Sequence, residues 1–473
     1  MKLNHKYIYQ LFVAIIAFFM LSSCEKQLEL TPSNVLLKED ALKTPEDMQK
    51  LLNSCYDALA NAHNGEYQII SDLLSDDLDE PYSRPEFRME VYNRSTNIFN
   101  SDLGALYNRL YIPVYRVNTM DLYYDLIPGL SESEITRMKA EGSFIRALCH
   151  FQVAKLWSRP WGYTSDNSHL GIPIKRNTES LTTQRSTVAE TYQYILSQLD
   201  YAIANLPVTN NGYATVDAAK ALKAMVYFQM NDFANARPLL DDIINSGTYI
   251  LSDSVDRFRG NTSSISSEFI FSFVSLNALT DNRGGNFIGT YRDNAAVPGI
   301  GITRELYNLI NADTTDIRRN LVKAFNIGQS NEYFTCSKFN DDYFAAPLIT
   351  LTQLLLTRAE IAAETGDVNT ASDDINEIIA RAYPGNANKL TSPGLGASNL
   401  LVVIREERRK ELFAEGDRTD YLKRACAYGN RSQVISYPTT IRSAPWDCGG
   451  LYVQFPDAER IDGFVINEEG GCQ

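Results

Sequence analysis

Paired helical repeats are the feature that most limits how this chain can fold. Residues 214–247 (ATVDAAKALKAMVYFQMNDFANARPLLDDIINSG) carry two apolar stripes with helical spacing, separated by Asn231-Asp232 and closed by Gly247. Apolar residues at every third or fourth position predict amphipathic helices, and the polar break predicts a tight turn. Small Ala224 allows the two helices to cross closely. A unit of about 34 residues with this design is typical of a tetratricopeptide hairpin.

The same device recurs along the chain. Residues 354–384 repeat it with a Gly-Asp turn and a terminal proline, and two looser pairs join 141–157 to 187–206 and 45–60 to 101–126. The spacing between these units is irregular, so a regular solenoid is not expected. The predicted fold class is mainly α, a tetratricopeptide-like scaffold of four helical hairpins.

Long insertions separate the predicted hairpins. They lie at about 64–100, 158–186, 248–300 and 425–473, and they are rich in Gly, Asn, Ser, Pro and Tyr. Short β-like runs such as Glu268–Val274 occur inside them. Loops of this length in a compact protein are usually functional. We therefore expect the hairpins to supply structure and the insertions to supply any chemistry.

The N-terminus predicts a lipid anchor. Lys2 and Lys6 precede an apolar run, residues 11–21, which is too short to span a bilayer and suits the core of a signal peptide. The following Leu-Ser-Ser-Cys24 resembles the bacterial lipobox, in which the cysteine is lipidated. We predict residues 1–23 as a lipoprotein signal peptide and 24–473 as one mature domain tethered to a membrane through Cys24. A plain signal peptide with a chance cysteine is the alternative.

The charge of the chain argues against nucleic acid as a partner. The formal net charge is −14, and removing residues 1–23 with their two lysines makes it −16. No basic stripe offsets this total, so neither nucleic acid nor an anionic membrane surface is an expected partner. The cysteines show no C-x-x-C pair, so neither a zinc site nor a redox motif is predicted. Cys448 and Cys472 flank a loop-rich terminus and could form a disulfide.

Catalysis is not expected. The mature chain has only His63, His150 and His169, and His150 lies on an apolar helix face typical of a core residue. The motifs G-x-S-x-G, G-x-x-x-x-G-K-[ST] and H-E-x-x-H are absent. The acidic run Ser71–Glu80 could coordinate calcium, but it lacks the spacing and central glycine of an EF-hand, and we interpret it as a helix end leading into a solvated loop. No cofactor or metal is predicted.

Several blocks in order resemble the SusD/RagB family. The stretch 404–424 (IREERRKELFAEGDRTDYLKR) is similar to the family's R-R-x-E-L-x-x-E-G-x-R signature, and 141–157 (EGSFIRALCHFQVAKLW) is similar to its central helix. The two clearest hairpins look like its inner repeats. Thr419 to Tyr421, His150 and Gln152 depart from the usual residues at positions expected to affect packing only. We expect the charged signature side chains to form structural ion pairs, not a phosphate site.

This resemblance implies a function. Family members look like outer-membrane lipoproteins exposed on the cell surface, each capping a TonB-dependent (SusC-like) transporter and capturing oligosaccharides for import. Some branches resemble oligopeptide binders instead. A tetratricopeptide-type scaffold that assembles surface proteins without binding nutrient is a further alternative.

Candidate ligand contacts come from the insertions. Recognition of a saccharide needs aromatic faces for the sugar ring and amides, carboxylates or guanidinium groups for the hydroxyls. The insertions that supply this mixture are 67–99, 282–293 and 446–452. The predicted contacts are Asp77, Tyr92, Arg283, Asn286, Tyr291 and Trp446. Each aromatic ring could instead pack its own loop, and for Trp446, between Pro445 and Asp447, that is the favoured interpretation.

Overall fold

The structure is a computed structural model, and it describes most of the chain after residue 41. The described residues are 42–80, 86–178, 184–253, 255–258, 266–294, 297–428, 440–460, 463–469 and 471–472. The predicted signal peptide and Cys24 lie outside these ranges. Among the described helices, none combines the length and apolar character needed to cross a bilayer.

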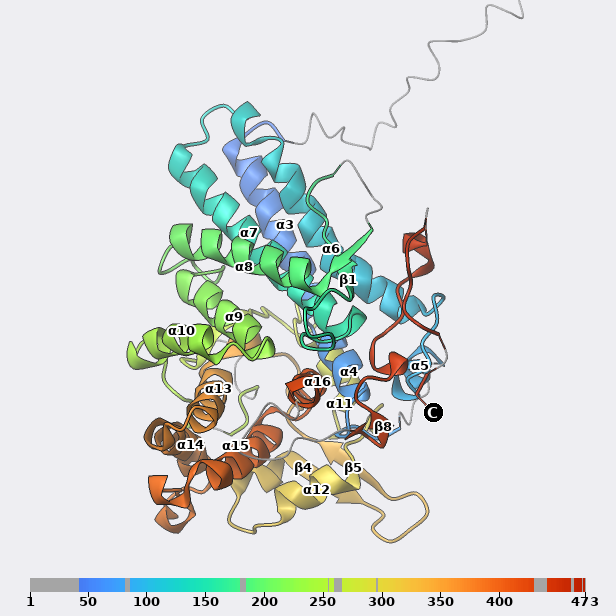
Figure 1. The fold of residues 1–473 in the computed structure, drawn as a ribbon, viewed down its shortest axis with the longest axis vertical. Helices are drawn as coiled ribbons and strands as arrows, with labels where there is room; N and C mark the ends of the chain where they lie inside the picture. Colours follow the sequence, from blue (N-terminus) through green and yellow to red (C-terminus); the bar gives the residue numbers. More distant parts are fainter. Residues whose placement is uncertain are drawn as a thin grey trace, which may run out of the picture.

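Four helical hairpins form the scaffold, which confirms the predicted fold class. Figure 1 shows them following one another from the top of the view to its lower left. Consecutive hairpins pack on each other, α6 on α7, α8 on α9 and α10 on α13. The pairs are α3 (Pro45–Ala62) with α6 (Ser101–Asp121), α7 (Glu132–Trp157) with α8 (Val188–Asn205), α9 (Val216–Gln229) with α10 (Phe233–Asn245), and α13 (Leu351–Glu364) with α14 (Val368–Ala382).

Local sequence signals account for where these helices begin and end. Thr44, Ser131, Thr187 and Thr350 each form a capping box, in which the side chain accepts a backbone N–H of the first turn. Asn231, at the turn predicted from the sequence, has a left-handed φ of 57°, a conformation that asparagine tolerates better than most residues. Ala224 and Ala236 are fully buried at the crossing of α9 and α10.

The insertions add short helices and two-stranded sheets around the scaffold. The additional helices are α4 (Glu66–Leu73), α5 (Glu86–Tyr92), α11 (Gly285–Tyr291), α12 (Arg304–Asn311), α15 (Ala397–Leu412) and α16 (Arg418–Tyr428). The antiparallel strand pairs are β1 (Leu170–Pro173) with β2 (Arg185–Thr187), β3 (Phe269–Phe273) with β6 (Ala346–Thr350), β4 (Val322–Phe325) with β5 (Tyr333–Cys336), and β7 (Thr440–Ile441) with β8 (Ala444–Pro445). Strand β3 lies within the β-like run that the sequence predicted.

A buried charge network joins the signature segment to the rest of the fold. Arg318 is fully enclosed, and it donates to Asp316, to Glu407 and to Glu411 at 2.6–3.0 Å. Glu411 also binds Arg257 and Arg381. Although burial acts to raise the pKa of Glu411, these three arginines and Lys338 lower it to about 2. The prediction that the signature forms structural ion pairs is confirmed.

Candidate functional site

Two of the predicted ligand contacts, Arg283 and Asn286, lie beside the exposed face of α3. Arg283 Nη1 donates to Asp57 Oδ1 at 2.7 Å, and Asn286 Nδ2 donates to Asn64 Oδ1 at 2.8 Å. Between them, a Cβ on Gly284 would lie 2.4 Å from the ring of Phe344. Only glycine fits this close approach, so the turn is held against the core and both side chains are fixed next to α3.

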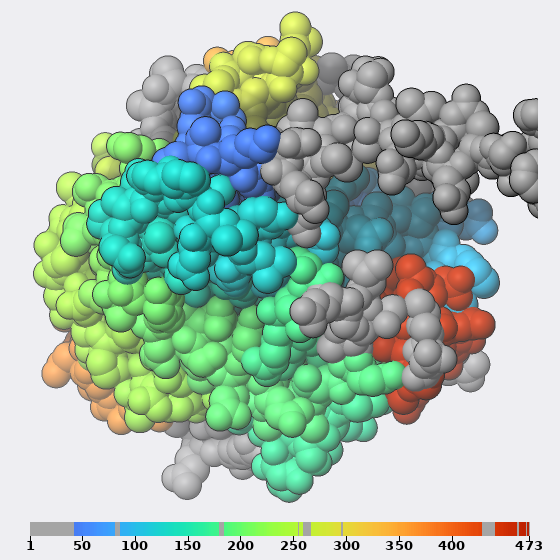
Figure 2. Space-filling model, turned by 90° about the horizontal axis from the view of Figure 1, so that it is seen from above, coloured from blue at the N-terminus to red at the C-terminus, as the bar shows by residue number. Residues whose placement is uncertain are grey.

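The surface along α3 contains two adjoining hollows that share Asp57. One, of about 270 Å³, lies between α3, the turn at Tyr213 and the segment from β3 to Arg283. The other, of about 380 Å³, lies between α3, α6 and Asn286. We call the two together the α3 groove. In Figure 2 the blue surface of α3 lies beside the yellow surface of the insertion between α10 and α12.

An aromatic ring and an apolar floor mark the first half of the groove. Tyr213 is partly exposed, and its ring centroid lies 4.7 Å from that of Tyr56 beneath it. The Tyr56 hydroxyl donates to Glu141 at 2.6 Å and accepts from the backbone N–H of Ala214 at 3.2 Å. Burial, followed by the Glu141 carboxylate, raises the pKa of Tyr56 well above its usual value, so its hydroxyl stays a donor. The ring of Tyr213 therefore packs on a Tyr56 ring whose position is fixed by two hydrogen bonds.

Polar side chains follow the length of the groove. Asn53, Asp57, Asn61 and Asn64 occupy one face of α3 and the turn after it, and Asn61 Nδ2 lies 3.4 Å from Asp57 Oδ2. Side-chain amides both donate and accept hydrogen bonds, as sugar hydroxyls do. The groove thus offers one partly open ring and a row of amides, with Asp57 and Arg283 at the centre.

Asp77 and Tyr291 are not available to a ligand, which corrects their prediction as contacts. Asp77 is 1% exposed and accepts from Arg409 Nε at 2.7 Å. Tyr291 is 0% exposed, and its ring centroid lies 5.3 Å from that of Phe339. Both residues belong to chain segments that read as loops in the sequence but are covered by neighbouring elements in the fold.

The acidic run Ser71–Glu80 is also less solvated than predicted. Asp72 is 1% exposed and accepts from the backbone N–H of Gly416 at 2.8 Å. Asp76 binds Arg418 at 2.7 Å, and although burial acts to raise the pKa of Asp76, Arg418 and Arg409 lower it to about 2. Within the described ranges, no group of three His, Cys, Asp or Glu side chains could hold a metal ion.

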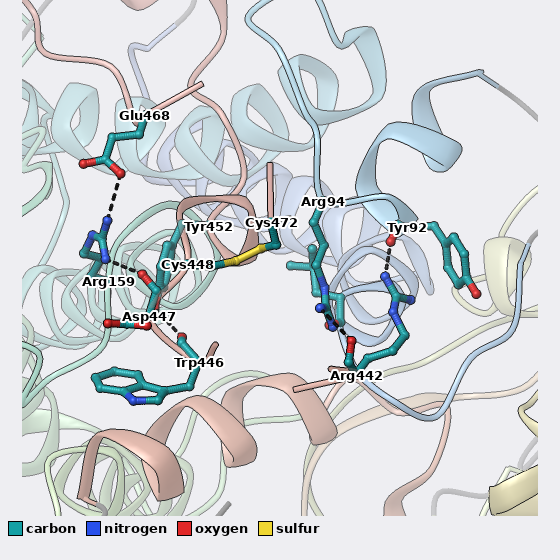
Figure 3. Close-up of a disulfide and its surroundings, with 11 residues drawn as sticks. Tyr92, Arg94, Arg159, Arg442, Trp446, Asp447, Cys448, Tyr452, Glu468 and Cys472 are labelled. Carbon is teal, nitrogen blue, oxygen red and sulfur yellow. Dashed lines mark hydrogen bonds and ion pairs between the residues drawn. A yellow bond between two sulfur atoms is a disulfide. The ribbon is translucent and has the colours of Figure 1, made fainter. Parts of the chain in front are cut away.

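Neither Tyr92 nor Trp446 lines the α3 groove. Figure 3 shows the two side chains on opposite sides of the disulfide between Cys448 and Cys472. The guanidinium of Arg442 covers the Tyr92 ring at 4.1 Å. Trp446 is partly buried, and its carbonyl accepts from the Tyr452 hydroxyl at 3.1 Å. A disulfide joins Cys448 to Cys472, as the sequence allowed.

A third hollow, which we call the C-terminal hollow, lies beside the disulfide. It measures about 280 Å³ and is lined by Tyr163, Arg159 and Glu468, among other residues. Arg159 Nη2 lies 3.1 Å from Glu468 Oε2, and its guanidinium covers the Tyr163 ring at 4.3 Å. The ring of Trp446 meets Tyr163 edge-on at 6.1 Å. This hollow also combines aromatic and polar groups, but Arg159 already occupies one face of Tyr163.

Sequence reasoning missed most of the α3 groove. Asp57, Arg109 and Arg116 lie on α3 and α6, and a polar residue on a helix normally reads as a solvated face. Tyr213 lies in the short turn before α9, outside the four predicted insertions. The only available signal was the row of asparagine and aspartate residues along α3, which is unusual because these residues are weak helix formers.

Family models match both halves of the chain. Residues 28–228 match the model described as "Starch-binding associating with outer membrane", and residues 303–460 match the SusD family model. The chain belongs to the SusD/RagB family.

Individual SusD/RagB relatives are distant in sequence but close in fold. SusD-like protein P38 of Formosa agariphila is 24% identical over 52% of this chain and 47% of its own length. The chain spans about half the length of the curated relatives it matches.

Solved structures share the architecture. A SusD superfamily protein from Bacteroides thetaiotaomicron is 23% identical, with a TM-score of 0.74 over 90% of this chain and 100% of that one. Surface glycan-binding protein A from the same organism, solved with laminarihexaose, is 20% identical, with a TM-score of 0.70 over 90% of this chain and 99% of that one.

Proposed function

We propose that this protein is a cell-surface lipoprotein that binds an oligosaccharide in the α3 groove and delivers it to a TonB-dependent outer-membrane transporter. Membership of the SusD/RagB family supports the general role, and the laminarihexaose complex of one structural neighbour supports a glycan as ligand. Lipidation at Cys24 would provide the membrane tether.

The observation that carries the proposal is the chemistry of the groove. Tyr213 offers a partly open ring supported by Tyr56, while Asp57, Asn61 and Arg283 offer hydrogen bonds directly beside it. Sugar rings have an apolar face and a polar edge, so they need both kinds of contact at once. Stacking on one ring contributes about 1 kcal/mol beyond area burial. Affinities between millimolar and micromolar are reasonable for several such contacts.

The test is calorimetric titration of the full-length protein, purified in detergent, against a panel of neutral glycans, acidic glycans and peptides. We expect a glycan to bind and the double variant Tyr213→Ala with Asp57→Ala to weaken it at least about tenfold. The matched control is Tyr201→Ala, because Tyr201 is 40% exposed on α8 and lies outside the groove.

Other results of the titration would support a different binding site or a different function. Glycan binding that survives the groove variant but is lost in Tyr163→Ala would place the site at the C-terminal hollow. Binding of peptides alone would favour an oligopeptide carrier. If nothing on the panel binds and no transporter co-purifies, the alternative of a scaffold for surface proteins is the better explanation.

A further inference from the structure

The second half of the α3 groove is the hollow between α3, α6 and Asn286, and it is positively charged. The chain as a whole carries a net charge of −14. Its lining includes two guanidinium groups, those of Arg109 and Arg116, and a single carboxylate, that of Asp57. Arg283 already binds that carboxylate at 2.7 Å. Arg283 also binds Asp281 at 2.5 Å, so it does not serve Asp57 alone. Two arginines against one carboxylate still leave the lining with an excess of positive charge.

Most of the N–H donors on the side chains of Arg109 and Arg116 have no hydrogen-bond acceptor in the described part of the chain. Within the described part of the chain, the side chain of Arg109 forms no hydrogen bond or ion pair, and the guanidinium of Arg116 donates only to the backbone carbonyl of Ser54. Neither Glu66 nor Asp102 forms an ion pair with Arg109 in the described part of the chain. Glu66, whose pKa is raised by burial and lowered in part by Arg88 and Arg109, lies 3.6 Å from Arg88. Asp102 lies about two turns away along α6.

The spacing of the arginines suits a ligand with more than one acidic group. They are seven residues apart on α6, so they lie on one face, about 10 Å apart along the axis. Ile112 lies between them, 41% exposed, and provides a small apolar surface. The amides of Asn61, Asn64 and Asn286 line the opposite side. A guanidinium is the side chain best matched to a carboxylate, because its two parallel N–H groups bind both oxygens.

We infer that the protein binds an anionic oligosaccharide that carries uronate carboxylates, and that Arg109 and Arg116 each bind one of those carboxylates. This inference rests on the proposed function, because it assigns a ligand class to the same groove. The uncharged part of the glycan lies toward Tyr213, and the acidic part lies between α3 and α6. The net negative charge of the protein then limits binding of the anionic glycan to the groove, because the rest of the surface repels anions.

The experiment compares matched ligands on the full-length protein in detergent. The probes are oligouronates of several linkage types, each beside its own carboxyl-reduced form, and a sulfated galactan beside its desulfated form. We expect an oligouronate to bind at least about tenfold more tightly than its reduced counterpart, and this preference to weaken as salt is added. Tighter binding of the sulfated probe than of every oligouronate would overturn the assignment to carboxylate.

Variants separate this inference from the proposed function. The double variant Arg109→Gln with Arg116→Gln should remove the preference for the acidic probe, and Arg116→Lys should restore only part of it. The control is Arg304→Gln with Arg460→Gln, which changes the net charge equally at side chains that are 62% and 54% exposed. An undiminished preference for the acidic probe in the arginine variant would overturn the inference, and glycan binding that still depends on Tyr213 and Asp57 would then leave the proposed function intact. Failure of all glycans to bind would overturn both.

Discussion

His150 should make the stability of this protein depend on pH, and the structure allows the size of the effect to be worked out. The ring is 0% exposed, Nδ1 lies 2.7 Å from the carbonyl of Arg146, and Nε2 accepts from the backbone N–H of Lys175 at 3.2 Å. This pattern requires a neutral ring with its proton on Nδ1. Burial, with Arg146, Arg176 and Lys175 nearby, lowers the pKa of His150 from 6.5 to about 4.

The sign follows from which state binds more protons. Between pH 6.5 and about pH 4, the unfolded chain protonates His150 and the folded protein does not. Stability is therefore complete above the unfolded pKa and is lost as the pH falls toward the folded one. A lowering of this size corresponds to roughly 3 kcal/mol, at about 1.4 kcal/mol per pKa unit.

The assay is urea unfolding of the protein and of His150→Gln at a series of pH values between about 7 and 4. The variant loses favourable contacts, so it should be less stable at neutral pH, but its stability should fall less steeply with acid. His169→Gln is the control, because His169 is only half-buried and should change the slope less. Parallel curves for the wild type and His150→Gln would refute the reasoning.

Three further predictions concern the charge network, a close backbone contact and the anchor. Arg318→Ala should destabilise the fold by about 3–5 kcal/mol in thermal or urea unfolding, because it leaves the buried carboxylate of Asp316 without its cation and takes one cation from Glu407 and Glu411. Arg319→Ala, at an exposed position, should cost about 0.5 kcal/mol or less. Gly450→Ala should lower the unfolding temperature, because its Cβ would lie 2.0 Å from the carbonyl oxygen of Arg94; an unchanged temperature would mean that the C-terminal segment shifts freely. Cys24→Ser should leave a folded protein that no longer partitions with membranes, and retained partitioning would reveal a second attachment.

The candidate site shows where reasoning from the sequence stops. Arg283 and Asn286 were predicted because polar residues in a long insertion are often functional, and both lie at the groove. Tyr291 was predicted by the same argument, yet it is 0% exposed. The difference arises because α11 presents one side to the groove and the other to the core, and no residue pattern in so short a helix distinguishes the two sides.

The sequence by itself determined the helical hairpins, their turns and the family of the chain. These features depend on residues close together in the chain, where apolar periodicity, capping residues and turn residues act on their immediate neighbours. Only the tertiary structure decided which side chains are open to a ligand. Arg109 and Arg283 are far apart in the sequence, and both lie near Asp57 in the fold. Only the tertiary structure shows that Asp57 pairs with Arg283. Burial and charge pairing are properties of that packing, so the ligand site could not be assigned before the elements were placed together.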